Sequence, residues 1–183
     1  MAEVFVAGSR AVSRLNDQIR ERLDNIMRQN FTVLIGDANG ADKAVQQYLA
    51  SCHYKKVIVH SMEICRNNLG EWPIDRHTGI SSKRDRQYYG IKDIAMAQKA
   101  SCGFMLWDGK SKGTLTNVIN LLGAHKKALL YLSPKKQFFK LGSFDDLGQV
   151  LHATGISDVS RYLSSVGVNG QFDLDRNTAG LSG

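Results

Sequence analysis

The chain of 183 residues has little cysteine and lacks any long apolar run. Its three cysteines, Cys52, Cys65 and Cys102, form an odd set without Cys-x-x-Cys spacing. We therefore expect buried free thiols, no disulfide framework and no metal site. No stretch of about 18 uninterrupted apolar residues occurs, and the first residues carry no basic segment of the kind that opens a secretion signal. A cytosolic protein that does not enter a membrane is the expectation.

Acidic residues are absent from the segment Gly109 to Phe144. The formal net charge of the whole chain is +7. An excess of positive charge indicates either a polyanionic partner such as nucleic acid or a lysine-rich solvated face. We favour a small phosphate-bearing ligand, which needs fewer charges, and keep nucleic acid as the alternative. The lysines of this segment are Lys110, Lys112, Lys126, Lys127, Lys135, Lys136 and Lys140.

The rest of the composition is that of an ordinary globular protein, with 43% hydrophobic and 22% charged residues. Short apolar runs alternate with amphipathic helical patterns along the first 132 residues. Strands are expected over 3–7, 31–35, 56–60, 102–107 and 128–132, and helices after Ser13, after Gly40, over 84–100 and over 114–125.

Strands that are almost continuously apolar and alternate with helices are typical of a parallel sheet covered on both faces. We therefore predict an α/β, Rossmann-like three-layer fold with a mainly parallel sheet of five or more strands, formed by residues 1–133. Residues 134–183 are expected to be a C-terminal extension that serves as a flap or tail. It has short helices over 145–152 and 158–166 and a flexible end rich in Gly, Asn and Ser.

A polar stretch from Ser61 to Ser82 interrupts this alternation. It is long for a connection inside a compact domain, and loops of such length are commonly lids or binding loops. We expect ligand contacts from Arg66, Asn67 and Trp72 in this stretch and from Arg84 just after it.

Three loops follow expected strands and are rich in glycine and hydrogen-bond donors. They are Gly8-Ser9-Arg10, Gly36 to Asp42, and Asp108 to Thr114. Ligands of open parallel sheets bind outside the carboxyl ends of the strands, where such loops lead into helix N-termini that attract anions. The alternative for each loop is a plain strand-ending turn. The second loop matches neither the Walker A motif nor the full dinucleotide-binding fingerprint.

Individual residues of these loops permit more than one role. Asp37 either accepts hydrogen bonds from ribose hydroxyls or is a solvated carboxylate. Asp42 is interpreted as a partner of the helix dipole. Trp107 is interpreted as a core residue, with base stacking as the alternative.

Taken together, Val6 to Arg10, Gly36 to Asp42 and Trp107 to Thr114 resemble the SLOG superfamily, which includes DprA-like and LOG-like Rossmannoid proteins. The resemblance covers roughly residues 3 to 133. Residues 66–73 and 83–85 are similar to a small bacterial subgroup of that superfamily. The resemblance implies a site for nucleotides, NAD-derived ligands or ADP-ribose-like molecules, with the phosphates near the glycine turns.

The enzymes of that superfamily have a feature that this chain lacks. LOG-type phosphoribohydrolases place a glutamate just after a Gly-Thr pair, where it serves the N-glycosidic reaction. Here Gly113-Thr114 is followed by Leu115, Thr116 and Asn117. Since Thr and Asn cannot replace a carboxylate base or nucleophile, hydrolysis would need another acid, and the candidates are Asp37, Asp85 and Asp108.

The leading hypothesis is a SLOG-type binding or sensor protein for a nucleotide ligand, with no obligatory cofactor. The alternatives are an N-glycosidase that acts on a nucleotide and a DprA-like nucleic acid binder. A homodimer is expected, because exposed apolar helix faces in such folds often pair two subunits. The expected ligand-binding residues are Gly8, Ser9, Arg10, Gly36, Asp37, Gly40, Asp108, Gly109, Lys110, Ser111, Gly113 and Thr114.

Overall fold

A mostly parallel sheet with helices on both faces organises the chain, as the alternation of apolar runs predicts. The structure is a computed structural model that describes residues 2–79, 86–156 and 158–165. In these residues the sheet has seven strands in the order β4-β3-β2-β1-β5-β6-β7. All neighbouring strands are parallel except β6 and β7, which are antiparallel. The α/β, Rossmann-like prediction is confirmed, with a sheet larger than the five-strand minimum.

The elements alternate along the chain for most of its length. In order they are β1 (Glu3–Gly8), α1 (Asp17–Arg28), β2 (Thr32–Gly36), α2 (Ala41–Ser51), β3 (Val57–Ser61), β4 (Ile74–Arg76), α3 (Arg86–Lys99), β5 (Cys102–Trp107), α4 (Lys112–Gly123), β6 (Ala128–Leu132), the short 3₁₀ helix η1 (Ser133–Lys135), β7 (Gln137–Leu141), α5 (Phe144–Ala153) and α6 (Val159–Ser165).

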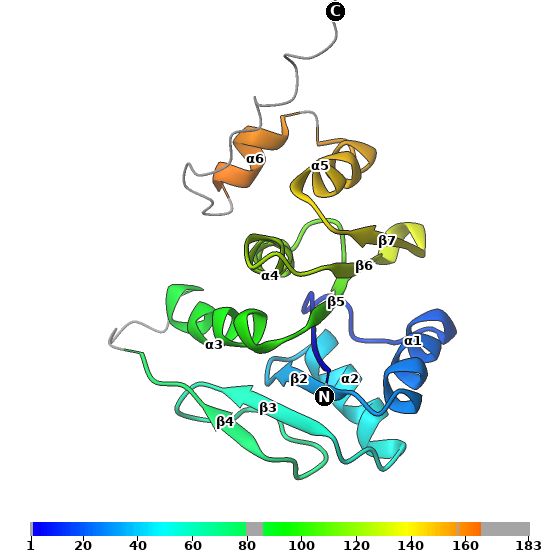
Figure 1. Cartoon of the computed structure of the whole chain (residues 1–183), viewed down its shortest axis with the longest axis vertical. Helices are drawn as coiled ribbons and strands as arrows, with labels where there is room; N and C mark the ends of the chain where they lie inside the picture. Colours follow the sequence, from blue (N-terminus) through cyan, green and yellow to red (C-terminus); the bar gives the residue numbers. More distant parts are fainter. Residues whose placement is uncertain (1, 80–85, 157, 166–183) are drawn as a thin grey trace, which may run out of the picture.

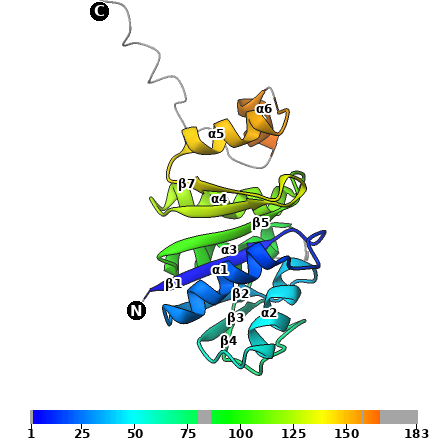
Figure 2. The same ribbon diagram turned by 90° about the vertical axis from the view of Figure 1, so that its right-hand side faces the viewer.

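The helices form a layer on each face of the sheet. Figure 1 shows α1 and α2 on one side and α3 and α4 on the other, while Figure 2 shows the strands stacked in order, with α5 beyond β7. Each layer encloses a separate core, because alternate residues of a strand point to opposite faces. Val4 and Val6 pack with α1 and α2, whereas Phe5 and Ala7 pack with α3 and α4.

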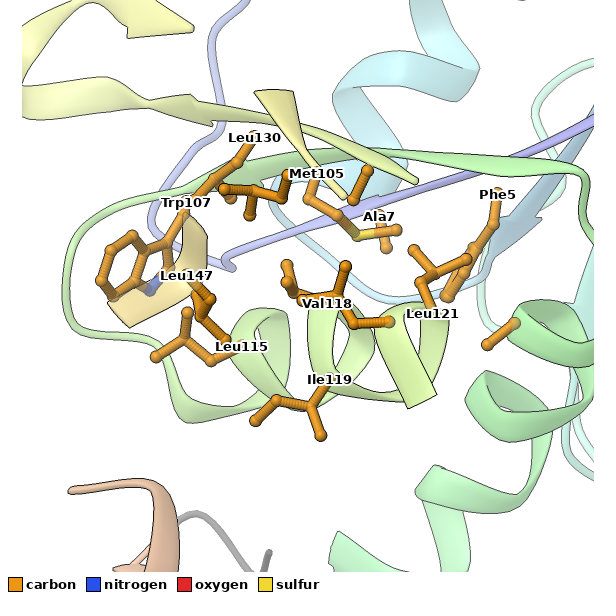
Figure 3. Close-up of a cluster of buried hydrophobic side chains, with 14 of the residues drawn as sticks. Phe5, Ala7, Met105, Trp107, Leu115, Val118, Ile119, Leu121, Leu130 and Leu147 are labelled. Carbon is orange, nitrogen blue, oxygen red and sulfur yellow. The ribbon is translucent and has the colours of Figure 1, made fainter. Parts of the chain in front are cut away.

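The core under α4 fixes the position of the loop after β5. Figure 3 shows Met105 and Trp107 of β5 packed with Leu115 and Val118 of α4. Trp107 is completely buried and its indole N–H donates to the carbonyl of Ser111 at 3.1 Å. It is therefore a core residue, as interpreted from the sequence, and base stacking is excluded in this conformation.

Two strands of the sheet, β4 and β7, are not predicted from the sequence. β4 lies within the polar stretch from Ser61 to Ser82, so that stretch is not a plain loop. It is short and only partly buried, so no apolar run marks it. β7 is partly exposed and lies after residue 133. Together with α5, whose Leu147 and Leu151 join the α4 core, it continues the fold past that residue. The tail expected over 167–183 lies outside the described residues.

The first helix begins later than expected. Asn16, not Ser13, caps α1, and its side-chain oxygen accepts from the amide of Ile19 at 3.0 Å. The Asn16 side chain is itself held by the hydroxyl of Tyr131 on β6. The cap of α1 is thus a residue whose side chain is also bonded to a distant strand.

Among the described residues, no helix is both long and apolar enough to span a lipid bilayer.

Candidate functional site

The chain changes direction across the sheet between β1 and β5. The strands β1 to β4 follow one another toward one edge, and β5 then returns to the other side of β1. The loops after β1 and β5 consequently leave toward opposite faces, α1 packing in one core and α4 in the other. Such a switch point opens a crevice at the carboxyl ends of the two strands, which is where ligands of open α/β sheets bind.

Ser9 joins the loops that meet at this point. Its backbone N–H donates to the carbonyl of Leu106 on β5 at 2.8 Å, and its own carbonyl accepts from the amide of Ala41 at the start of α2 at 3.1 Å. Its side chain is buried and is among the groups that lower the pKa of the Asp108 carboxyl. The structure therefore brings together the three glycine-rich loops that the sequence singled out.

Gly40 makes the close approach of two of these loops possible. It has a φ of +85°, a backbone conformation that favours glycine. A Cβ on Gly40 would also lie 2.3 to 2.6 Å from backbone atoms of Arg10. No side chain caps the helix α2 that follows, and the amide of Ala41, its first residue, donates to the carbonyl of Ser9.

The loop after β5 is ordered by its own hydrogen bonds. One carboxylate oxygen of Asp108 accepts from the amides of Lys110 at 3.1 Å and Ser111 at 2.7 Å, which folds the turn over Gly109 at a φ of +82°. Burial raises the pKa of Asp108, but these bonds and the one from Ser9 outweigh it and hold the pKa below its ordinary value. Asp108 is therefore ionised at neutral pH.

The same loop supplies donors at the start of α4. Ser111 caps the helix, while Lys110 and Gly113 are exposed and Thr114 is buried. Among the described residues, a Cβ added at Gly113 would meet nothing within 4 Å. Packing within this part of the chain thus imposes no need for glycine at residue 113.

Asp37 is committed to a contact within the protein. It is 1% exposed, so the solvated alternative is wrong. Its two oxygens accept from Nη2 of Arg66 at 2.7 Å and Nε at 3.1 Å, and the backbone amide of Arg66 adds a bond at 3.0 Å. Burial raises the pKa of Asp37, but these bonds and the charge of Lys92 hold it below its ordinary value. Since the side chain is buried and three of its bonds go to Arg66, Asp37 is committed to that residue and not exposed to a ligand.

Asp42 and Lys92 bring two further buried charges to this edge. A Cβ on Gly36 would lie 2.5 Å from Oδ2 of Asp42 and 2.8 Å from Nζ of Lys92, so both groups converge on the bare face of the glycine. Burial raises the pKa of Asp42 to about 6, although Lys92 acts in the opposite direction. Asp42 is thus more than a surface partner of the helix dipole. Buried groups with shifted pKa values cluster at functional sites.

The polar stretch after β3 is anchored to this charged region. The buried side chain of Gln46 donates to the carbonyls of Gly36 at 2.8 Å and Asn67 at 3.1 Å, and it accepts from the amide of Leu69 at 3.1 Å. Asn67 donates to the carbonyl of Asp37 at 2.8 Å. The expected loop residues Arg66 and Asn67 therefore lie beside the second glycine loop.

Trp72, which was expected to contact the ligand, is a core residue. It is 5% exposed, packs in the α1 and α2 core, and donates its indole N–H to the carbonyl of Tyr54 at 2.8 Å. It anchors the stretch and does not face a ligand. Arg84 and Asp85, the remaining candidates from the sequence, lie outside the described residues.

Asn117 occupies the region where the resemblance leads one to expect a glutamate. It is buried on α4, one turn after Thr114, and its side-chain oxygen accepts no hydrogen bond from the described residues. The side-chain oxygen of Asn117 is therefore a buried hydrogen-bond acceptor near the start of α4. An amide cannot replace the carboxylic acid of a glutamate.

Several lysines of the acid-free segment hold helix ends. Nζ of Lys126 donates to the carbonyls of Ala97 at 3.0 Å and of Gln98, at the end of α3. Nζ of Lys135 donates to the carbonyl of Ala153, the last residue of α5, at 2.6 Å. Cations stabilise helix C-termini. Part of the positive charge thus has a structural role.

Sequence reasoning missed Lys92, Gln46 and a group formed by His60, Asp75 and His77. The ligand-type atoms of this group all lie within 4.8 Å of one another. The available signal was the pattern Asp-x-His at 75–77, which would place both side chains on one face if the chain is extended there. The expectation of no metal site was based on cysteine spacing, which gives no information about a group of histidines and a carboxylate.

The cysteines themselves are free, and Cys52 is exposed, so the expectation of buried thiols is wrong for that residue.

Comparison with known proteins identifies no family for this chain. No protein-family model matches it, and a search of curated proteins finds no match. The fold and the site geometry are therefore the basis for a functional proposal.

Proposed function

We propose that the protein binds a nucleotide or a nucleotide-derived ligand of the NAD or ADP-ribose type. The site lies at the carboxyl ends of β1, β2 and β5. The observation that carries the proposal is the meeting of three glycine-rich loops at the switch point between β1 and β5, joined through Ser9. The motifs of these loops resemble those of SLOG proteins, which supports the same ligand class.

Phosphate groups of the ligand contact the two loops that offer N–H groups and cations. The start of α4, with Ser111, Gly113 and the exposed Lys110, provides a helix N-terminus for one phosphate. The exposed Arg10 and the start of α2, which no side chain caps, provide a second position. Both are suited to anions because helix N-termini carry partial positive charge.

Asp108 is the carboxylate for the ribose in this proposal. It is ionised at neutral pH, and its second oxygen is directed to neither Lys110 nor Ser111. A charged carboxylate repels phosphate but accepts hydrogen bonds from hydroxyl groups. Asp37 positions Arg66 and the second glycine loop, and does not contact the ligand directly.

The direct test is mass spectrometry of ligand released from the full chain, purified without added nucleotide. Calorimetric titration with AMP, NAD and ADP-ribose follows, on wild type and on Gly113→Val. We expect the variant to bind at least about tenfold more weakly, a loss of about 1.4 kcal/mol, because a side chain there obstructs phosphate. Gly123→Val is the matched control, since residue 123 also has open space but lies at the far end of α4. Equal affinity of wild type and a folded Gly113→Val would contradict the proposal.

An N-glycosidase is the second candidate, and Asp42 is the observation that favours it. A buried carboxyl whose pKa is raised to about 6 has the property of a general acid or base near neutral pH. Incubation with nucleoside monophosphates, NAD and ADP-ribose, followed by chromatography for free base, separates the two functions. Turnover of about one per second or faster that is lost in Asp42→Asn would establish the enzyme. Asp108→Asn and Asp37→Asn are the comparison variants.

A further inference from the structure

Three metal-ligand side chains converge at the β3 edge of the sheet. His60 on β3 is in register with Asp75 on β4, and paired residues of parallel strands point to the same face. His77 follows Asp75 by two residues, so it continues that face, and its backbone N–H donates to the carbonyl of Ser61 at 2.8 Å. The pairing of β3 with β4, and the bond that holds His77 just beyond β4, thus bring the two imidazoles and the carboxylate together.

The distances between the three groups fit a common ion. Nδ1 of His60 lies 2.9 Å from Nε2 of His77, and these nitrogens lie 3.8 Å and 3.7 Å from the two oxygens of Asp75. Ligands about 2.0 to 2.1 Å from a tetrahedral ion are roughly 3.3 to 3.4 Å apart. The observed separations scatter around that spacing, so small side-chain rotations bring all three atoms to one ion.

The burial of the group resembles that of an open metal site. The side chain of His60 is 1% exposed, whereas those of His77 and Asp75 are 15% and 43% exposed. The buried side fixes one ligand, and the exposed side admits an ion and leaves room for water. Among the described residues, Nε2 of His60 has no hydrogen-bond partner, so its Nδ1 is its only polar contact and faces the group.

Charges around the group act in both directions. Burial lowers the pKa of His60 to about 4, and Lys99 and Lys92 of α3 contribute to that shift while Asp75 opposes it. The two lysines reduce the affinity for any cation, and the carboxylate of Asp75 compensates for part of their charge.

We propose that His60, Asp75 and His77 bind a divalent transition-metal ion, with Zn²⁺ as the best match. Two imidazoles and one carboxylate are ligands that zinc accepts, and three protein ligands leave a further position open for water or substrate. Mg²⁺ and Ca²⁺ are excluded as preferred ions because they favour oxygen ligands. The proposal is independent of the nucleotide site, although Gly36 pairs with His60 in the sheet and the two sites are thus one strand apart.

Calorimetric titration of the chelator-treated full chain with Zn²⁺ tests the site. Cys52→Ser is the background, which removes the exposed thiol as a competing ligand. We expect one ion per chain, and a loss of affinity of at least about tenfold in His77→Ala and in Asp75→Asn, since even outer-shell changes commonly cost 10- to 100-fold. Both residues are partly exposed, so both variants should fold, which circular dichroism checks. His152→Ala, an exposed histidine on α5, is the matched control and should bind as the background does.

X-ray absorption at the zinc edge provides a readout of the ligands themselves. We expect nitrogen and oxygen neighbours at about 2.0 to 2.1 Å and no sulfur at about 2.3 Å. Unchanged affinity in both His77→Ala and Asp75→Asn, or a sulfur shell in the spectrum of the Cys52→Ser background, would overturn the proposal. Tighter binding of Mg²⁺ than of Zn²⁺ would overturn it as well.

Discussion

Gly36 shows how a single residue without a side chain holds a group of charges together. Its backbone conformation would accept another residue, because its φ is not positive. The space is the constraint, since Asp42 Oδ2 and Lys92 Nζ occupy the position of a Cβ. The glycine of this loop thus serves the protein's own charges as well as any ligand.

Gly36→Ala is expected to destabilise the fold by about 1–3 kcal/mol, the usual cost of forcing extra atoms into a packed site. Chemical denaturation measures the change. Gly113→Ala is the control, because its Cβ meets nothing within 4 Å and alanine is favoured in a helix, so its stability should be unchanged or up to about 1 kcal/mol higher. A Gly36→Ala protein as stable as wild type would show that the two charged side chains move apart freely.

Asp42 gives the folded protein a pH dependence of defined sign. Its pKa is raised by burial from 3.8 to about 6, so the folded state binds its proton more tightly than the unfolded state does. Stability from this group is therefore fully present below pH 4 and is lost as pH rises to about 6. A shift of about two units corresponds to a change on the order of 3 kcal/mol.

Denaturation of wild type and Asp42→Asn across pH 4 to 7 checks this expectation. The decline should be absent in Asp42→Asn. Asp145→Asn is the matched control, because Asp145 is also the second residue of a helix but is exposed. A control that loses the decline as well, or an Asp42→Asn protein that keeps it, would contradict the assignment to Asp42.

At the scale of elements, Gln46 of α2 holds the polar stretch after β3. Its completely buried amide makes three hydrogen bonds, to Gly36, Asn67 and Leu69. Gln46→Leu leaves these backbone groups without partners, so we expect a loss of at least about 2 kcal/mol and faster proteolysis between residues 61 and 73. Gln47→Leu, the exposed neighbour on the same helix, should change neither. Equal digestion of the two variants would mean that the bonds of Arg66 and Asn67 to Asp37 and of Trp72 to Tyr54 anchor the stretch without Gln46.

The sequence predicts the elements that depend on local patterns and misses those that depend on distant contacts. The five apolar strands and the three glycine loops were placed from periodicity and turn residues. β4 has only three residues, two partly buried and one exposed, and forms by pairing with β3, which no local pattern encodes. In the same way, the pairing of Asp37 with Arg66 and the approach of Lys92 to Gly36 arise only when α3 and the stretch after β3 fold over β2.

At the scale of the whole molecule, the net charge of +7 is the feature that a nucleic acid partner would need. Lys126 and Lys135 donate to carbonyls at helix ends, and the excess charge is thus partly absorbed by the fold. We expect binding to a short random-sequence DNA duplex to be no tighter than about 1 µM at physiological salt, the non-specific range. Fluorescence anisotropy over a salt series measures it. A Kd of about 10 nM or tighter, as in specific complexes, would favour the DprA-like alternative.

The central position of β1 has a consequence for synthesis on the ribosome. β1 is made first, and β2 covers one of its edges soon afterwards, but the other edge pairs with β5. At about 5–20 residues per second, the interval between residues 36 and 102 lasts roughly 3 to 13 s. During that time the apolar run Val4 to Ala7 presents an unpaired edge, a template for pairing with other chains. A nascent or truncated chain that ends before Cys102 is therefore a natural client for chaperones.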